Sequence, residues 1–498
     1  MTLAGFDPSW AATTSGPGVP PHGRRITIAV LGAGIAGLAA GYELEKLGYD
    51  VVVLEADSRI GGRVFTRRFG GPDGPIVEFG AMRIPANHCF TMRYVDELGL
   101  RHRLRPFRNI LSDPNNYLRI GSQLVRVRDA AAPLIRDTER YAGENSYRRD
   151  TLLFVGWLHA MVRALGPREL REFSQDDVTK MLALADRLDI ASFLHDYQVD
   201  LNAAFSAYPE LRAVCNSRLA SFLDDLIRES STEMLTLTGG MAQLVDGFAS
   251  RVRSPICTGQ EIVGLDVRRD GVSVHLAGAR RRSVTTYPIV LCTIPFSILR
   301  GLSLTGVGAD KLDTIATLEY GSATKVALHC REAFWGRDGI AGGGSAPGGL
   351  SRQTYYPDAG GDDGSVLLGS YAIAEDADVL GKLSEPVRHA VVTDELAELH
   401  PQLRQSETVL ETMSVAWGER RWSKGCTARR WGITDAERAH EVERATRPQG
   451  RLFFAGEHCS ISPAWINAGI ESALRAVAQI DIFARRLVDD WSHVEESA

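Results

Sequence analysis

The chain has 498 residues, of which 44% are hydrophobic and 24% charged, a balance typical of a folded globular protein and unlike a disordered or collagen-like chain. Only six of its 56 basic residues are lysines, and 62 acidic residues bring the net charge to −6, which argues against a nucleic-acid-binding protein. The seven cysteines form no CxxC pair, so neither a metal site nor a secreted disulfide framework is predicted.

Residues 1–25 are rich in Gly, Pro and Ser and lack the apolar core of a targeting signal. This composition predicts a flexible arm, and we expect a cytoplasmic protein. No run without a charged residue is longer than 17 residues, and one of that length, 26–42, includes four glycines. Because a membrane span needs about 20 mostly apolar residues, we expect no membrane association.

A predicted βαβ unit follows, with buried strands at 26–31 and 50–55 and a helix between them. Gly32, Gly34 and Gly37 form the pattern GxGxxG at the start of this helix. Glycines at this spacing allow a tight turn and let backbone N–H groups approach a pyrophosphate at the helix N-terminus. Glu55 ends the second strand, where we expect its carboxylate to accept hydrogen bonds from ribose hydroxyls and to disfavour the 2′-phosphate of NADP. The unit therefore predicts a dinucleotide site.

The rest of the chain divides into a helical middle and a region of strands. Between about 130 and 235, Leu and Ala recur at helical spacing, and from 261 an alternating pattern around an Arg-Asp-Gly turn predicts a hairpin. We expect the glycine-rich segment 336–350 to be an exposed loop. The other strands and the last helix are predicted at 288–296, 325–330, 365–373, 451–456 and 465–486. Nucleotide-binding elements thus lie at both ends of the chain.

Two further motifs point to one family. Residues 59–63 read RIGGR, in which a second glycine pair allows close backbone approach and Arg63 offers a guanidinium to a phosphate. Residues 453–477 read FFAGEHCSISPAWINAGIESALRAV. With the glycine motif and Glu55, this succession resembles the flavin-dependent amine oxidases from residue 26 to about 485. The resemblance implies FAD rather than a nicotinamide cofactor.

The family implies an α/β fold with a Rossmann-like FAD-binding domain of the glutathione-reductase type, a substrate domain with a mixed sheet, and a helical insertion. The FAD-binding domain is expected to be discontinuous, and its segments are 26–85, 236–300 and 445–490. Residues 86–130 and 301–444 form the expected substrate-binding domain, and 131–235 the helical domain. The residues expected to contact FAD are Gly32, Ala33, Gly34, Ala36, Gly37, Glu55, Ala56, Arg63, Gly80, Ala81, Met82, Arg83, Ile262, Trp417, Glu457, Trp465 and Ile466.

The block EFGAMRIP at 78–85 resembles the L-amino-acid oxidases and the amino-acid 2-monooxygenases. In those enzymes the matching arginine, here Arg83, grips the substrate carboxylate, and the matching tyrosine, here Tyr371, donates its hydroxyl to the same group. Trp465 matches an aromatic wall beside the substrate, and the neighbouring Ala464 replaces a glycine common in the family. By the same resemblance, Lys325 holds a water near flavin N5.

The resemblance implies an oxidase that moves a hydride from the Cα of an L-amino acid to flavin N5, without a general base. The imino acid then gives a 2-oxo acid and ammonia, and dioxygen gives hydrogen peroxide. Two alternatives remain open: a 2-monooxygenase that forms an amide, and a biosynthetic amine or amide oxidase in which Arg83 binds another anion. The amino-acid side chain stays undetermined, and a homodimer is expected.

Cys426 raises the question of a covalent flavin. The segment from Trp417 to Cys426 resembles the part of the monoamine oxidases whose cysteine is bonded to the flavin 8α-methyl. The amino-acid oxidases, which this chain resembles more closely, bind FAD non-covalently, and Thr427 replaces the tyrosine that follows that cysteine. We therefore expect non-covalent FAD, with Cys426 the candidate if a bond exists.

Overall fold

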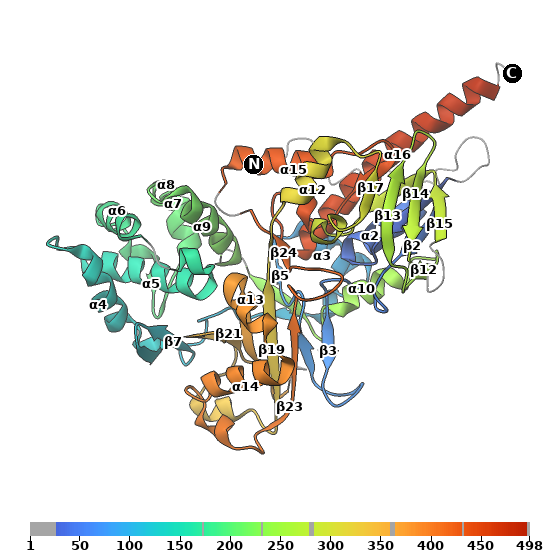
Figure 1. The fold of residues 1–498 in the computed structure, drawn as a ribbon. Helices are drawn as coiled ribbons and strands as arrows, with labels where there is room; N and C mark the ends of the chain where they lie inside the picture. Colours follow the sequence, from blue (N-terminus) through green and yellow to red (C-terminus); the bar gives the residue numbers. More distant parts are fainter. Residues whose placement is uncertain are drawn as a thin grey trace.

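The computed structural model describes residues 26–171, 174–230, 233–277, 283–358, 364–430 and 433–495. The arm predicted at residues 1–25 lies outside them. Figure 1 shows three parts: a sheet region beside the long helix α16, a second large sheet, and a block of helices at the opposite side of the molecule.

A five-stranded parallel sheet of order β12-β2-β1-β16-β25 confirms the predicted Rossmann-like core. Its strands are β1 (Thr27–Leu31), β2 (Asp50–Leu54), β12 (Ile256–Cys257), β16 (Ile289–Cys292) and β25 (Leu452–Phe454). Successive side chains of a strand face opposite sides, so Ile28 and Val30 enter one core while Ala29 and Leu31 enter another. The sheet is therefore buried on both faces.

Helices cover one face of this sheet, and a smaller sheet covers the other. The helices are α2 (Ile35–Lys46), α3 (Cys89–Glu97), α10 (Ala242–Ala249) and α16 (Ile466–Glu495). The smaller sheet has the order β15-β14-β13-β17 and contains β13 (Ile262–Val267), β14 (Val272–Leu276), β15 (Ser283–Tyr287) and β17 (Ser303–Thr305). β13 and β14 pair antiparallel, which confirms the predicted hairpin.

The second large sheet has seven strands in the order β23-β19-β22-β21-β20-β7-β8. The strands are β7 (Tyr117–Ile120), β8 (Gln123–Arg126), β19 (Ala323–Cys330), β20 (Gly344–Gly348), β21 (Arg352–Tyr355), β22 (Val366–Ile373) and β23 (Val409–Ala416). β20 pairs parallel with β7, whereas the other neighbours are antiparallel, so the sheet is mixed as expected. α13 (Ala374–Lys382) and α14 (Glu385–Leu396) pack on one face.

The glycine-rich segment 336–350 corrects the prediction of an exposed loop. It contains the buried strand β20, which lies between β21 and β7 inside the mixed sheet. A Cβ on Gly344 would lie 3.1 Å from the Tyr355 ring, so the glycine permits close approach of β21. Glycine inside a strand often marks such an approach. A glycine-rich strand of this kind has the same composition as a glycine-rich loop, so composition alone does not distinguish the two.

The predicted helical block is present as α4 (Ala131–Ala142), α5 (Arg149–Leu165), α6 (Gln175–Ala185), α7 (Leu201–Ala207), α8 (Glu210–Ala213) and α9 (Ser217–Ser230). Its apolar side chains share one core with the face of the mixed sheet opposite α13 and α14. The shorter elements include β3 (Thr66–Arg68), β4 (Ile76–Glu78), β5 (Ile84–Pro85), β6 (Leu104–Pro106), β11 (Met234–Leu237), α11 (Phe296–Leu299), α12 (Ala309–Thr317), β24 (Thr427–Ala428) and α15 (Asp435–Thr446).

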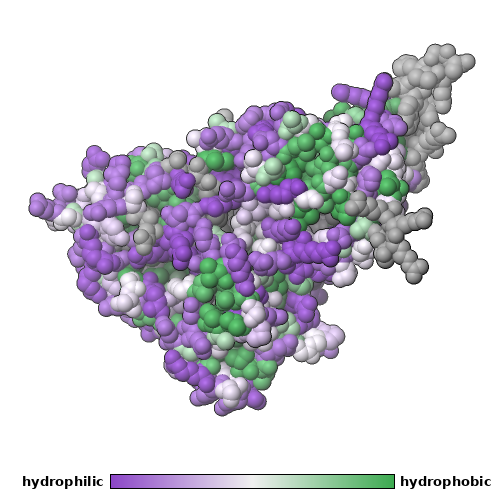
Figure 2. All heavy atoms as spheres, viewed as in Figure 1, coloured by the Kyte–Doolittle hydropathy of each residue, from purple (hydrophilic) through white to green (hydrophobic). Residues whose placement is uncertain are grey.

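The face shown in Figure 2 is mostly hydrophilic, with hydrophobic side chains gathered near α12 and over α13 and α14. On α13 and α14, Val379 and Val387 are about half exposed at 48% each. Within the described residues, no helix combines the length and the hydrophobicity that crossing a membrane requires.

Candidate active site

A large cavity lies where the parallel strands end. About 1,540 Å³ of space lies between its lining atoms, with the open mouth included. The residues that follow β1, β2, β16 and β25 all line it, including Gly32, Glu55, Thr293 and Gly456. In open α/β sheets, ligands bind at the carboxyl ends of the strands, so this is the expected place for a dinucleotide.

The two glycine motifs meet at the floor of the cavity. The backbone of Gly32 has φ +104°, and a Cβ on Gly37 would lie 1.9 Å from the Gly32 carbonyl oxygen, so both positions require glycine. Gly61 donates its N–H to the Ala33 carbonyl at 2.8 Å, which joins the RIGGR turn to the first motif. Among the described residues no side chain caps α2 at Gly34, and Gly34, Ile35 and Ala36 at the start of the helix line the cavity. A helix N-terminus in this state suits a pyrophosphate.

Glu55 braces the first turn as well as lining the cavity. One carboxylate oxygen accepts the N–H of Ala33 at 2.7 Å, and the other accepts the N–H of Asp57 at 2.8 Å. Burial raises the pKa of Glu55 even though these two N–H groups act in the opposite direction. Each oxygen keeps a second lone pair, so the ribose contact expected from the sequence is compatible with this geometry.

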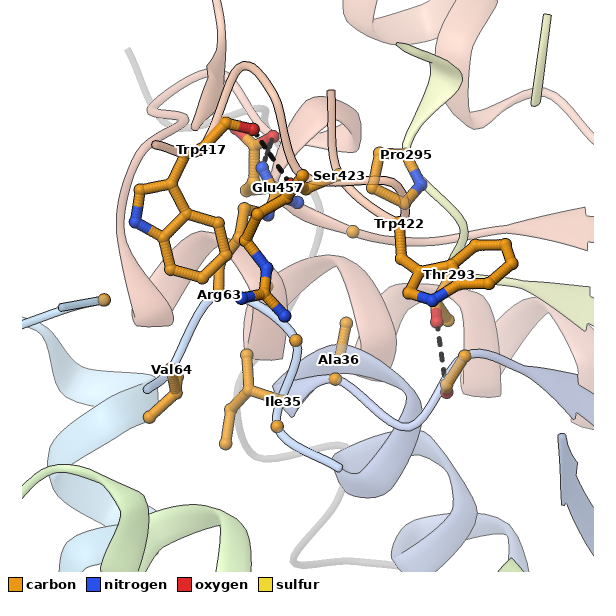
Figure 3. A pocket seen from close by; sticks show the side chains of 18 of the residues that line it. Ile35, Ala36, Arg63, Val64, Thr293, Pro295, Trp417, Trp422, Ser423 and Glu457 are labelled. Carbon is orange, nitrogen blue, oxygen red and sulfur yellow. Dashed lines mark hydrogen bonds and ion pairs between the residues drawn. The ribbon is translucent and has the colours of Figure 1, made fainter. Parts of the chain in front are cut away.

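Arg63 and Glu457 join the two ends of the chain inside the cavity (Figure 3). Arg63 Nη1 lies 2.6 Å from a Glu457 carboxylate oxygen and 2.9 Å from the Cys426 carbonyl oxygen. Burial alone would raise the pKa of Glu457, but the Arg63 charge and the N–H of Ala428 bring the net shift below its usual value. The N-terminal and C-terminal motifs therefore form one ionised unit.

Lys325 faces the site from the middle of β19. Alternate residues of a strand face the same side, so Lys325 lies on the same face of β19 as Ala323 and Ala327. This face packs against the helical block, and the opposite face packs against α13 and α14. Its Nζ donates to the carbonyl oxygens of Glu78 at 3.0 Å and Gly80 at 2.7 Å. Burial lowers the pKa of Lys325 to about 8. Below that pH the cavity wall carries a buried positive charge, which favours negative charge on a bound group.

Arg83 lies at the edge of the cavity, beside the ring of Trp465. Its guanidinium carbon is 5.9 Å from the ring centres of both Trp465 and Phe107. Nη1 donates to the Asn109 side-chain oxygen at 3.3 Å and to the Tyr355 hydroxyl at 3.4 Å. A planar cation framed by aromatic rings is well suited to a carboxylate that arrives with an apolar group.

Most residues predicted to contact FAD or substrate line this cavity: Gly32, Gly34, Ala36, Glu55, Ala56, Arg63, Gly80, Ala81, Ile262, Lys325, Tyr371, Trp417, Glu457, Ala464, Trp465 and Ile466. Ala33, Gly37, Met82 and Arg83 do not line it. Ala33 and Gly37 support the glycine turn from behind, and Met82 lines a smaller neighbouring cavity whose space is about 670 Å³.

The sequence predictions missed Thr293 and Pro295, which follow β16, and Trp422 and Ser423, which lie in the loop before Cys426. Figure 3 places Trp422 beside Thr293 and Pro295, across the cavity from Trp417. The end of β16 could have been inferred, since strand ends in a parallel sheet form the site. The loop carries no such local signal, because its position depends on how it folds back over the sheet.

The match to protein families agrees with this geometry. The family model described as flavin containing amine oxidoreductase matches residues 35–481. The chain belongs to this family. FAD is accordingly its cofactor, and the uncapped helix, the glycine cradle and the Lys325 wall fit it.

Within the family, the chain is 48% identical over 461 residues to the flavin-dependent L-tryptophan oxidase RebO of Lentzea aerocolonigenes, which covers 91% of this chain and 98% of that protein. It is 28% identical over 470 residues to the putative L-amino-acid oxidase YobN of Bacillus subtilis (strain 168), covering 91% and 94%. Among solved structures, putrescine oxidase bound to putrescine has a TM-score of 0.61 at 19% identity and covers 93% of this chain and 99% of its own, which shows the shared fold.

Proposed function

We propose that this enzyme oxidises the Cα–N bond of an L-amino acid with an aromatic side chain, L-tryptophan or a close relative, to the imino acid, which hydrolyses to the 2-oxo acid and ammonia. Arg83 carries the proposal, because its guanidinium sits between aromatic rings at the edge of the FAD cavity. The 48% identity to an L-tryptophan oxidase supports the choice of side chain.

The protein's part in the reaction is orientation and charge. Bound FAD supplies the two-electron oxidation, and dioxygen would return it to the oxidised form with release of hydrogen peroxide. Arg83 would bind the carboxylate, Tyr371 would add a hydroxyl from the cavity wall, and Trp465 would pack against the substrate. Lys325 would hold positive charge beside the place where negative charge develops.

A substrate panel tests the proposal directly. L-Tryptophan should bleach the flavin absorbance in the absence of oxygen faster than aliphatic amino acids or amines do, and in air it should give peroxide and the 2-oxo acid. Amide and carbon dioxide as products would instead indicate the 2-monooxygenase. Faster bleaching by an amine without a carboxylate would contradict the role of Arg83.

Arg83→Ala tests the carboxylate contact. Removing one partner of a buried charge pair costs about 2–5 kcal/mol, so kcat/KM for the amino acid should fall roughly 30- to 4,000-fold. Arg108→Ala is the matched control, since Arg108 is half exposed and pairs with Asp358 at 3.5 Å outside the FAD cavity. Equal kcat/KM values for the two variants would show that Arg83 does not bind the carboxylate.

A further inference from the structure

A chain of hydrogen bonds runs from Arg83 away from the cavity to the helical block. Arg83 Nη1 donates to the Tyr355 hydroxyl oxygen at 3.4 Å, and the Tyr355 hydroxyl donates to the Gln353 side-chain oxygen at 3.1 Å. The Gln353 amide nitrogen then donates to the carbonyl oxygen of Ala164 at 3.1 Å. Tyr355 and Gln353 thus each accept from the residue before them in this series and donate to the residue after them.

The strand geometry explains why these groups meet. Gln353 and Tyr355 are two residues apart on β21, so their side chains share one face of the sheet. They are 1% and 6% exposed, and a buried amide or phenol is costly unless it is hydrogen-bonded, which fixes their orientation. Ala164 lies in the last turn of α5, where carbonyl groups lack partners within the helix and carry the negative end of its dipole.

The same turn of α5 is held a second time. Arg352, which is 2% exposed, donates through Nε to the Ala164 carbonyl oxygen at 3.3 Å and through Nη1 to the Ile373 carbonyl oxygen at 2.9 Å. The end of α5 is thereby bonded to two side chains of β21, and one of them, Arg352, is itself held by β22. Gln353 consequently donates to an acceptor that is itself anchored.

A guanidinium binds a carboxylate through two parallel N–H groups, so the plane of the guanidinium decides whether it can bind. Nη1 of Arg83 is held by Asn109 and Tyr355 together, and rotating the plane would break one of these bonds. Tyr355 also packs its ring against Phe107, with centres 5.8 Å apart, and Phe107 is one of the rings beside Arg83.

We propose that Tyr355 and Gln353 are positioning residues that orient Arg83 for the substrate carboxylate, and that they transmit to it the position of helix α5. The inference rests on the proposed function, in which Arg83 binds a carboxylate. It assigns to the helical block a role in carboxylate recognition in addition to any contact with the substrate side chain.

Two ligands of nearly the same shape separate positioning from general damage: indole-3-propionate, which has a carboxylate, and indole-3-propionamide, which has a neutral amide in its place. Their Kd values are measured on the FAD-loaded enzyme from the change in flavin absorbance. Tyr355→Phe keeps the ring and removes the hydroxyl. We expect it to raise the Kd of the propionate about ten-fold, or about 1.4 kcal/mol, and that of the propionamide less than about two-fold. Gln353→Leu should act in the same direction.

Tyr356→Phe is the matched control. Tyr356 is the next residue and is 5% exposed, but its hydroxyl lies on the other side of the strand, hydrogen-bonded to Ser345 at 3.0 Å and His400 at 2.9 Å. It should leave the ratio of the two Kd values unchanged. In an Arg83→Ala background, Tyr355→Phe should add nothing further, because residues that act through one another are non-additive.

The outcomes distinguish the two proposals. If the unmodified enzyme does not prefer the propionate, or if Arg83→Ala keeps that preference, the proposed function fails. The proposed function is supported if the unmodified enzyme prefers the propionate and Arg83→Ala loses that preference. In that case the positioning inference is wrong if Tyr355→Phe weakens the binding of both ligands equally or has no effect. It is also wrong if Tyr355→Phe has the same effect in the Arg83→Ala background as in the unmodified enzyme.

Discussion

Lys325 illustrates how one side chain is placed by its surroundings. It lies in an apolar strand, where an unpaired charge would be costly. Its Nζ donates to two backbone carbonyl oxygens and to the Met82 sulfur, which is 3.5 Å away. The Tyr371 ring centre lies 4.6 Å from the same nitrogen. The positive charge of Lys325 is thus held at the cavity wall. Because the pKa of Lys325 is about 8, the loss of this charge can be measured.

Lys325→Met should slow the reoxidation of flavin by dioxygen about 100-fold, as loss of a preorganised charge does in other sites, and slow its reduction by substrate much less. In the unmodified enzyme the reoxidation rate should fall as the pH rises through about 8, because the ammonium loses its proton there. The variant should lack this step in its pH profile. Stopped-flow absorbance measures both half-reactions.

Lys311→Met provides the control for that experiment. Lys311 is also buried, its pKa is also lowered to about 8 by burial, and it also donates to backbone carbonyls, those of Arg444 and Ala445. It does not line the FAD cavity. Equal slowing of both half-reactions in Lys325→Met, or the same pH step removed in Lys311→Met, would assign Lys325 a structural role.

The charged site residues could be predicted from the sequence, but their neutral supports could not. Arg83 and Lys325 stand in recognisable motifs. Tyr355 and Gln353 acquire their roles from partners 272 and 189 residues away, Arg83 and Ala164, and no local spacing records such contacts.

At the scale of elements, the β1–α2 turn could be predicted because its physics is local. Gly32 is required by its positive φ, and Gly37 is required because a Cβ there would meet the Gly32 carbonyl oxygen, five residues earlier. The spacing of the two glycines in the sequence is therefore enough to predict the turn. β20 was missed because its glycines serve packing against β21, a relation that becomes visible only once the mixed sheet is assembled.

Gly37→Ala should abolish FAD binding, since the added Cβ would lie 1.9 Å from the Gly32 carbonyl oxygen and the turn would have to open. Gly41→Ala, one turn further along the same helix, meets only Val53 at 3.6 Å and Val51 at 3.7 Å. It should keep FAD and stabilise the helix by up to about 1 kcal/mol. The ratio of flavin to protein absorbance after purification measures the effect, and a yellow Gly37→Ala protein would contradict the role of the turn.

At the scale of the whole molecule, the cavity is assembled from segments far apart in sequence, and FAD contacts should hold them together. Burial raises the pKa of the Cys426 thiol although Arg63 and Lys325 act against it, so little reactive thiolate exists at neutral pH. Acid precipitation should therefore leave the yellow colour in the supernatant.

Apoprotein prepared in this way and refolded should gain about 2.7 kcal/mol of stability when FAD is added at 100 times its Kd, seen as a rise in Tm.

Cys426→Ser should release the same amount of FAD as the unmodified protein in this experiment. A yellow pellet that becomes colourless in Cys426→Ser would instead demonstrate a covalent flavin. An unchanged Tm on addition of FAD would mean that the cofactor does not hold the distant segments together.

The strand order β12-β2-β1-β16-β25 also constrains how the chain folds as it is made. β1 pairs with β16, which begins at Ile289, and β16 pairs with β25, which ends at Phe454. A nascent chain on the ribosome therefore carries an unpaired edge on β1 or β16 until residue 454 has been translated. Contacts of such long range slow folding, so the unfinished sheet is exposed to wrong pairing from the synthesis of β1 to that of β25, and the flavin site closes only after β25 has emerged.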